Sequence, residues 1–199
     1  ASAPQKLIQT LFDQRSDLSD ITIYQIHTEG AAPYAEDPET FKIKTLFVGP
    51  NIRKNVQKGH GSYIPVFLSE IPRLFTSRTL PIDVALISVS PPDEHGYCSL
   101  GPSVDVSVAA AERAKMVSAQ VNKSVPRTHG DGLIHIGKID HLVKCNEPIQ
   151  EIPAGNLSET ELAIGQNIAE LVDDGATLQM GIGNIPNAVL AALGNHKDL

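Results

Sequence analysis

Short apolar runs alternate along the chain with segments whose apolar residues recur at helical spacing. Residues 21–26 alternate apolar and polar positions with a period of two, which predicts a strand. Residues 45–48 also read as a strand, and residues 63–67 as a short edge strand or extended segment because they contain a proline. The run 84–89 is apolar throughout, as expected for a central parallel strand covered on both faces, and residues 115–121 predict a further strand.

The clearest predicted helix begins at Ser158. Ser158 is followed three residues later by Glu161, which is the sequence signature of a capping box. Gly175 is placed to end the helix as its C-cap. Apolar residues recur on one face of this helix, and they are Ile164, Ile168, Leu171 and Val172.

A strand, a glycine-rich loop and another helix are expected after Gly175. Residues 176–180 predict the strand and residues 181–184 a tight loop, while Pro186 is placed at the first position of a helix that ends at Gly194. Two other helices are expected at 51–56, capped by Asn51, and at 104–114. Strands that alternate with helices predict an α/β fold with a mainly parallel sheet and flanking helices.

Composition narrows the class of protein. The 199 residues are 41% apolar and 20% charged, which is ordinary for a soluble globular protein of one domain, or of one domain and part of another. The net charge of -7 argues against nucleic acid as the main partner. No apolar stretch approaches the roughly 18 residues of a membrane span, and the first residues lack a signal-peptide pattern, so we expect no membrane association and a cytoplasmic protein. Cys98 and Cys145 are too few for a disulfide framework and fit reduced thiols.

A linker is expected between Glu147 and Gly155, where prolines separate two patterned regions. The sequence therefore predicts two parts. Residues 1–150 form one α/β domain, and residues 151–199 form the start of a second α/β domain that carries the glycine-rich loop.

Two loops are candidate sites. Glycines in the segment Gly181–Pro186 would let a ligand approach the backbone, and free N–H groups at the helix start would favour an anion. Pro186 replaces the third glycine of a dinucleotide fingerprint, so a ligand loop, a plain tight turn and a nucleotide-binding domain all stay open. The loop Pro91–Gly96 follows a predicted parallel strand, where ligands bind, but it also fits a solvated turn. The chain has no histidine or cysteine spacing that predicts a metal site.

Three sequence blocks resemble one family: residues 86–101, residues 121–140 and residues 179–189. They are similar to the acetyl-CoA hydrolase/transferase family, which includes 4-hydroxybutyrate CoA-transferase and related butyrate or acetate CoA-transferases. The resemblance covers nearly the whole chain. It implies two α/β domains with the active site between them, acyl-CoA and short carboxylic acids as substrates, coenzyme A bound as a substrate, no metal, and a homo-oligomer.

The resemblance also implies a mechanism and site residues. A glutamate attacks the acyl-CoA thioester and becomes a glutamyl-CoA thioester, and the same site acts as a hydrolase if water intercepts the intermediate. The CoA-binding loop of the family falls on Gly181, Ile182, Gly183, Asn184 and Pro186, with Ile182 and Gly183 as candidate oxyanion donors. A motif loop expected to shape the acyl pocket falls on Pro91, Pro92, His95, Gly96 and Cys98.

The chain departs from the family pattern at both ends. The catalytic glutamate of the family lies a few residues beyond this last helix, in a segment like Thr-Glu-Met, and the chain ends at Leu199. Residues 1–4 match the first loop of the family, so the opening strand is missing. We therefore expect an incomplete and inactive chain of a CoA-transferase. A non-catalytic module for acyl-CoA binding or assembly is the alternative.

Overall fold

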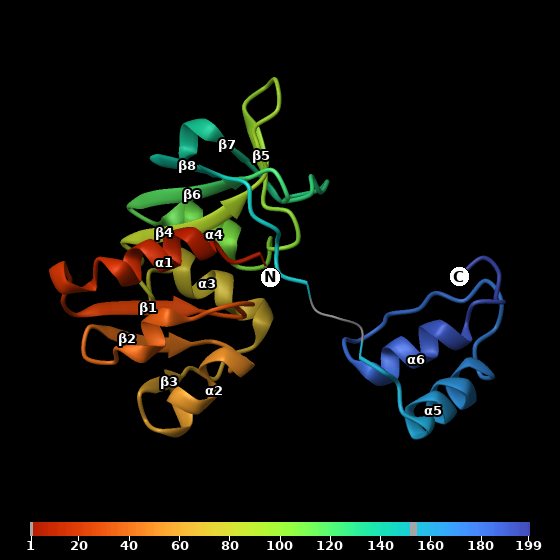
Figure 1. Ribbon diagram of the computed structural model, residues 1–199. Helices are drawn as coiled ribbons and strands as arrows, with labels where there is room; N and C mark the ends of the chain where they lie inside the picture. The colour runs from red at the N-terminus through yellow and green to blue at the C-terminus, as the bar shows by residue number, and fades with distance from the viewer. Residues whose placement is uncertain (1, 152–154) are drawn as a thin grey trace. The chain divides into compact units, whose positions relative to one another are not determined.

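Figure 1 shows the computed structural model of the chain, which describes residues 2–151 and 155–199. The chain divides into two compact units, one that ends at Gln150 and one that begins at Glu151. Pro153 and Ala154, which belong to the expected linker, lie outside the described residues. Within those residues, no helix combines the length and apolar character needed to cross a membrane. Parallel sheets flanked by helices confirm the predicted α/β class.

The first sheet of the first unit is parallel, with the order β1-β2-β3. Its strands are β1 (Ile21–Gln25), β2 (Phe41–Thr45) and β3 (Gly61–Tyr63). The strand predicted at 45–48 is misplaced, because β2 shares only Thr45 with that range. The segment Phe-Lys-Ile-Lys-Thr alternates with period two, and Phe41, Ile43 and Thr45 are its buried members.

The second sheet is also parallel and has the order β4-β6-β8. It consists of β4 (Val84–Val89), β6 (Met116–Asn122) and β8 (His141–Cys145). The expected central position of β4 is wrong, since β6 is the only strand paired with it among the described residues. Helices and loops bury the side chains of β4 instead. A continuous apolar run therefore indicates that both faces of a strand are covered, and it does not show that another strand lies at each of its edges. The arrowheads of β1, β2 and β4 point the same way, so the carboxyl ends of both sheets lie on one side of the unit (Figure 1).

A short antiparallel pair carries the motif loop. It pairs β5 (Tyr97–Ser99) with β7 (Leu133–His135), and Cys98 is opposite Ile134. Strands of three residues are too short to show periodicity, so the sequence pattern missed them.

The helices of the first unit are α1 (Gln5–Asp13), α2 (Pro50–Gln57), α3 (Ile71–Thr76) and α4 (Ser107–Arg113). Single 3-10 turns lie at Arg15–Asp17, Pro33–Glu36, Leu68–Glu70 and Ile136–Lys138. Asn51 does not cap α2, because Gly49 is the N-cap. The Asn51 amide instead donates to the carbonyl oxygen of Thr28 at 3.0 Å and joins two loops.

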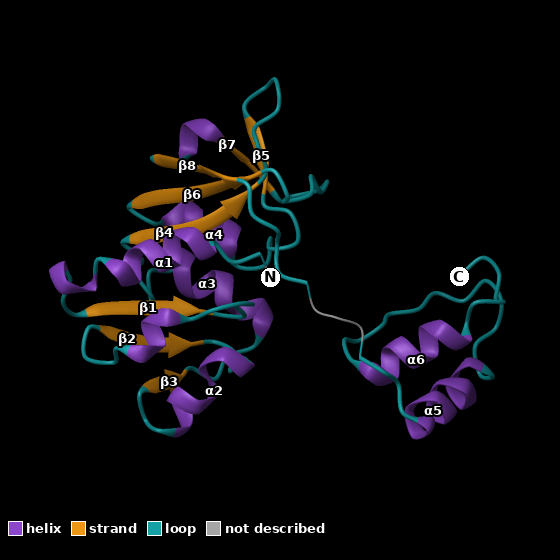
Figure 2. Cartoon of the chain, in the orientation of Figure 1, coloured by secondary structure: helices purple, strands orange, loops and turns teal. Residues whose placement is uncertain are grey.

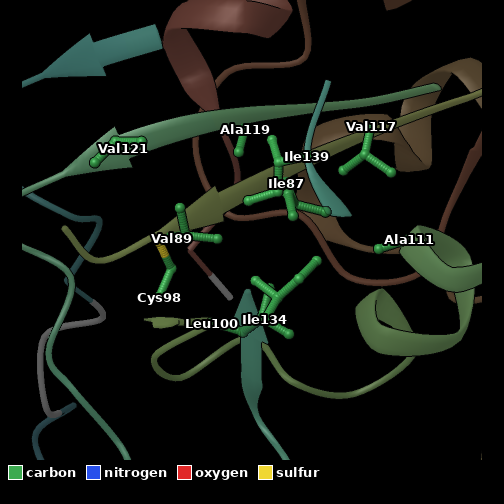
Figure 3. Packing of buried hydrophobic residues seen from close by; sticks show 10 residues of the cluster. All are labelled: Ile87, Val89, Cys98, Leu100, Ala111, Val117, Ala119, Val121, Ile134 and Ile139. Atoms are coloured by element: carbon green, nitrogen blue, oxygen red, sulfur yellow. The ribbon is translucent and has the colours of Figure 1, made fainter. Parts of the chain in front are cut away.

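The largest core cluster packs β4 and β6 against the β5–β7 pair (Figure 3). Its members are Ile87, Val89, Cys98, Leu100, Ala111, Val117, Ala119, Val121, Ile134 and Ile139. Two further clusters lie around α1 and β2 and around α3 and α4. The motif loop therefore emerges directly from the largest core cluster of this unit.

In the second unit, α5 (Glu159–Ala169) and α6 (Asn184–Ala192) pack on each other. The predicted capping box is confirmed: Ser158 Oγ accepts from the Glu161 N–H at 3.2 Å, and the Glu161 carboxylate accepts from the Ser158 N–H at 2.7 Å. The predicted end at Gly175 is wrong. The helix stops at Ala169, and Gly175, with φ +79°, lies in a later turn where its N–H donates to Lys197.

The predicted apolar face of α5 is only partly its buried face. Ile164 is half-buried, and Val172 packs against the cluster that contains Val189. Ile168 and Leu171 are 38% and 84% exposed, whereas Gly165 and Ala169 are buried. Small residues spaced four apart let the backbones of α5 and α6 approach closely, and this close packing determines which side of the helix faces inward.

The strand expected at 176–180 is not formed within residues 155–199 (Figure 2). Leu178 and Met180 are half-buried and Thr177 and Gln179 are exposed, so the alternation is present. An extended segment becomes a strand only when it has a ladder partner, and the described part of this unit supplies two helices instead.

Candidate functional site

The glycine-rich loop of the second unit depends on an unusual backbone conformation at Gly183. Gly183 is the N-cap of α6 and has φ +130° and ψ -179°. Side chains on L-residues exclude this region of backbone space, so the position requires glycine. A Cβ there would meet no atom within 4 Å, so the requirement comes from backbone conformation and not from crowding.

The first N–H groups of α6 have no partner within the helix and no side-chain cap. The first backbone bond of the helix runs from the Asn187 N–H to the Gly183 carbonyl oxygen at 3.1 Å. Pro186 is the third helical residue and not the first as predicted, and it fits because an N–H in the first turn has no partner within the helix. The N–H groups of Asn184 and Ile185 precede that bond, which makes this end of α6 favourable for a negatively charged oxygen.

The loop is exposed but held at both ends. Ile182 is fully exposed, and Gly181 and Gly183 are also on the surface. On one side, Met180 packs against the cluster that contains Val189. On the other side, the Asn184 side chain lies near the Glu161 carboxylate. The hydrogen bond from the Ser158 N–H lowers the Glu161 pKa, and Asn184 adds to this effect.

The motif loop of the first unit is closed by Asp93. Its Oδ1 accepts from the N–H groups of His95 and Tyr97 at 3.0 and 2.8 Å. Its Oδ2 accepts from Arg127 Nη2 at 2.5 Å, and Arg127 Nη1 donates to the Tyr97 carbonyl oxygen at 3.0 Å. The Tyr97 N–H bond, then that of His95 and the Arg127 charge, lower the pKa of Asp93. Asp93 and Arg127 therefore shape the loop.

Four of the five acyl-pocket candidates lie in this loop. Pro91, Pro92 and His95 are exposed. Gly96 has φ +81°, and a Cβ there would come to 2.8 Å from His135 Nε2. His135 itself stacks edge-on against Tyr97, with ring centroids 5.1 Å apart, so this histidine packs against the loop.

The fifth candidate, Cys98, is placed differently. Its side chain is completely buried beside Val89 in the core (Figure 3). Burial raises the pKa of the Cys98 thiol. The cysteine therefore packs beneath the loop and presents no thiolate at its surface.

Sequence reasoning missed a buried hydroxyl network below the motif loop. Ser99 Oγ accepts from the N–H groups of Gly101 at 3.1 Å and Thr128 at 3.0 Å. Ser90 Oγ accepts from the Ser99 N–H at 2.9 Å. The sequence does hold one signal of this network. Ser90 and Ser99 each adjoin a buried apolar segment, and a buried polar side chain must find a hydrogen-bond partner.

A search against protein-family models matches residues 1–153 to the acetyl-CoA hydrolase/transferase N-terminal domain. The chain belongs to the acetyl-CoA hydrolase/transferase family. The matched residues include the whole motif loop, so both Asp93 and Arg127 lie within the domain that defines the family. The glycine-rich loop lies outside the matched residues.

Relatives of this acetyl-CoA hydrolase/transferase family member extend over both loops. A succinyl-CoA:acetate/propanoyl-CoA:succinate CoA transferase of Fasciola hepatica is 48% identical over 202 residues, covering 100% of this chain and 42% of that protein. The 4-hydroxybutyrate coenzyme A transferase of Clostridium kluyveri is 44% identical, with 98% of this chain and 46% of that protein covered. The chain spans about half the length of these relatives.

Solved structures give the same relationship. RipA from Yersinia pestis is 32% identical, with a TM-score of 0.87, and the match covers 97% of this chain and 48% of that one. The 4-hydroxybutyrate CoA-transferase from Porphyromonas gingivalis is 38% identical, with a TM-score of 0.68 and 99% and 51% coverage. The family member therefore shares its fold with CoA-transferases.

Proposed function

We propose that the chain is part of a CoA-transferase that moves coenzyme A between short-chain carboxylic acids. The observation that carries the proposal is the glycine-rich loop at the start of α6, with Gly183 in a conformation reserved for glycine and no side-chain cap on the first N–H groups of the helix. Relatives named as CoA transferases support the reaction class, and acetate, butyrate and 4-hydroxybutyrate represent the acceptor acids.

The proposed reaction needs a carboxylate nucleophile and no change of oxidation state. A glutamate oxygen attacks the thioester carbonyl, the C–S bond breaks, and a mixed anhydride and CoA thiolate result. The thiolate attacks the glutamyl carbonyl and releases the first carboxylic acid as its carboxylate. The acceptor carboxylate then reverses both steps. A carboxylate is a weak nucleophile, so positioning and stabilisation of the tetrahedral oxyanion supply most of the rate.

We assign the oxyanion role to the loop, with the backbone N–H groups of Ile182 and Gly183 as donors. Fixed backbone donors need no reorganisation as charge develops on the thioester oxygen. The glutamate is proposed to follow Leu199 in a longer protein, because the family pattern has it a few residues beyond this helix. The 199 residues alone are then expected to bind but not to turn over.

Coenzyme A binding by the chain itself tests the loop. Amide resonances of residues 181–184 should shift when acetyl-CoA is added to 15N-labelled protein. Gly183→Ala should reduce these shifts and weaken binding, because alanine cannot hold the required backbone conformation. Gly175→Ala is the matched control: it also replaces a positive-φ glycine with open space around it. Shifts that are absent, or equal losses in both variants, contradict the loop assignment.

Transfer requires a longer test protein. The reading frame continued beyond Leu199, expressed as one chain, should exchange CoA between acetyl-CoA and a short carboxylate. Borohydride or hydroxylamine should trap a glutamyl thioester, and mutation of the glutamate in the Thr-Glu-Met-like segment to glutamine should abolish trapping. An active protein without the trapped species contradicts the mechanism.

Two alternatives predict different results. Release of free CoA without an acceptor acid indicates the hydrolase of the same family, which one relative from Neurospora crassa is named to be. A reading frame that stops at Leu199, with acyl-CoA binding but no turnover, indicates a binding or assembly module. A homo-oligomeric cytoplasmic enzyme remains part of the proposal, and size-exclusion chromatography with light scattering measures the oligomer directly.

A further inference from the structure

A small polar cavity lies at the carboxyl ends of β4 and β6 in the first unit. It offers about 20 Å³ to the centre of a water molecule. Its walls come from the start of α1, from the ends of these two strands, and from the segment after β8. The lining residues that carry the argument are Ser2, Ser88, Gln120, Asn122 and Glu147.

Four of the polar side chains around the cavity are themselves buried. Ser88, Gln120 and Asn122 are 4%, 3% and 2% exposed, and Ser2 is also buried. A buried amide or hydroxyl group is strongly unfavourable unless its hydrogen-bonding capacity is used. The cavity is therefore surrounded by groups that require partners.

Protein partners use only part of this capacity. Gln120 Oε1 accepts from the Lys6 N–H at 2.9 Å, and its side chain also lies beside the Cys145 thiol, so at least one of the two N–H bonds of its amide nitrogen is left for another partner. Ser88 Oγ meets Ser2 Oγ at 3.3 Å, a long contact for two hydroxyls, and each oxygen can also donate or accept once more.

Size selects the ligand. A water molecule needs roughly 10–15 Å³ of such space and two to four polar partners, so the cavity has room for one water. We infer that the cavity is a binding site for one structural water, held by the Ser88 hydroxyl and the Gln120 amide between the start of α1 and the segment after β8.

This water site lies where the chain leaves the first unit. The Asn122 side chain makes two hydrogen bonds to the backbone of Glu147. Its Nδ2 donates to the Glu147 carbonyl oxygen at 2.8 Å, and its Oδ1 accepts from the Glu147 N–H at 3.3 Å. The bound water and the Asn122 side chain together fix the outgoing segment against the sheet.

A pair of valine substitutions tests the inference. Ser88→Val replaces the hydroxyl with carbon and fills the cavity. It should expel the water, leave the Gln120 amide without its partner and lower the Tm. Ser118→Val is the control, since it makes the same change in β6, outside the cavity lining. A Tm that rises for Ser88→Val alone would show that the cavity is dry and overturn the inference.

A direct measurement avoids the question of whether the variant folds. The water should give a nuclear Overhauser effect to the side-chain amide protons of Gln120 in the unmodified chain, and a peak within hydrogen-bond distance of Ser88 Oγ in a high-resolution crystal structure. The absence of both signals would contradict the site, whatever the variants do.

Discussion

The backbone of Gly165 in α5 lies directly against Ala188 in α6. A Cβ on Gly165 would come to 2.7 Å from the carbonyl carbon of Ala188 and 2.8 Å from its oxygen. These are backbone atoms, which can move away only if one whole helix shifts.

Gly165→Ala should therefore destabilise the second unit. Alanine gains about 1 kcal/mol of helix propensity, but overpacking against backbone costs about 1–3 kcal/mol and should dominate. The measurement is urea unfolding followed by circular dichroism. Gly194→Ala is the control, because the nearest atom to its Cβ is 3.7 Å away and its change should stay within about 0.5 kcal/mol. Equal effects at both positions would contradict the close helix contact.

Ser99→Ala should destabilise the first unit by about 1–3 kcal/mol, because one buried and one half-buried N–H group lose their acceptor. Faster hydrogen exchange at the amides of Gly101 and Thr128 is the specific sign of this loss. Ser77→Ala removes an exposed hydroxyl and serves as the control. Unchanged exchange at both amides would refute the role of Ser99 as their acceptor.

Asp93→Asn should change how stability depends on pH. The folded state lowers the pKa of Asp93, so its stabilisation is present above about pH 4 and is lost as the pH falls through the folded pKa. Thermal unfolding should show that the Tm of the variant is below that of the unmodified chain at pH 7, and that this difference is smaller near pH 3. Asp83→Asn removes an exposed carboxylate paired with Lys115 and is the control. A Tm difference that is the same at both pH values would contradict the stabilising role of the ionised Asp93 carboxylate.

The two cysteines should react at very different rates. Burial raises the pKa of both thiols, but Cys98 is completely buried whereas Cys145 is half-buried. A thiol reagent should label one cysteine rapidly in the native chain and the second only as the first unit opens. Cys145→Ser should remove the rapid phase and leave the slow one. A rapid phase that survives this substitution would place Cys98 at the surface.

Local sequence signals predicted the elements that are fixed by near neighbours. The capping box at Ser158 formed as expected, because both of its partners lie within three residues. The parallel α/β class also followed from alternation of apolar runs. The position of β4 at a sheet edge did not, since strand order depends on long-range pairing that periodicity does not record.

The sequence predicted the two candidate loops from their glycines and from their position after apolar runs. It did not predict the side-chain contacts that hold these loops in place. Arg127 and Asp93 are 34 residues apart, and no local pattern joins them. Cys98 was predicted to belong to the site because of its position in the motif. The alternation of side chains along β5, however, places Cys98 on the buried face, opposite to Tyr97.

The conformation of Gly183 has a consequence for the gene. Every glycine codon changes by a single base only to another glycine codon, to a stop, or to a residue that carries a Cβ. No single-base missense change can therefore preserve φ +130° at this position without strain. In a library of random point mutants selected for function, codon 183 should accumulate synonymous changes alone, while codon 182 varies, because the Ile182 side chain is exposed and its proposed role uses only the backbone N–H.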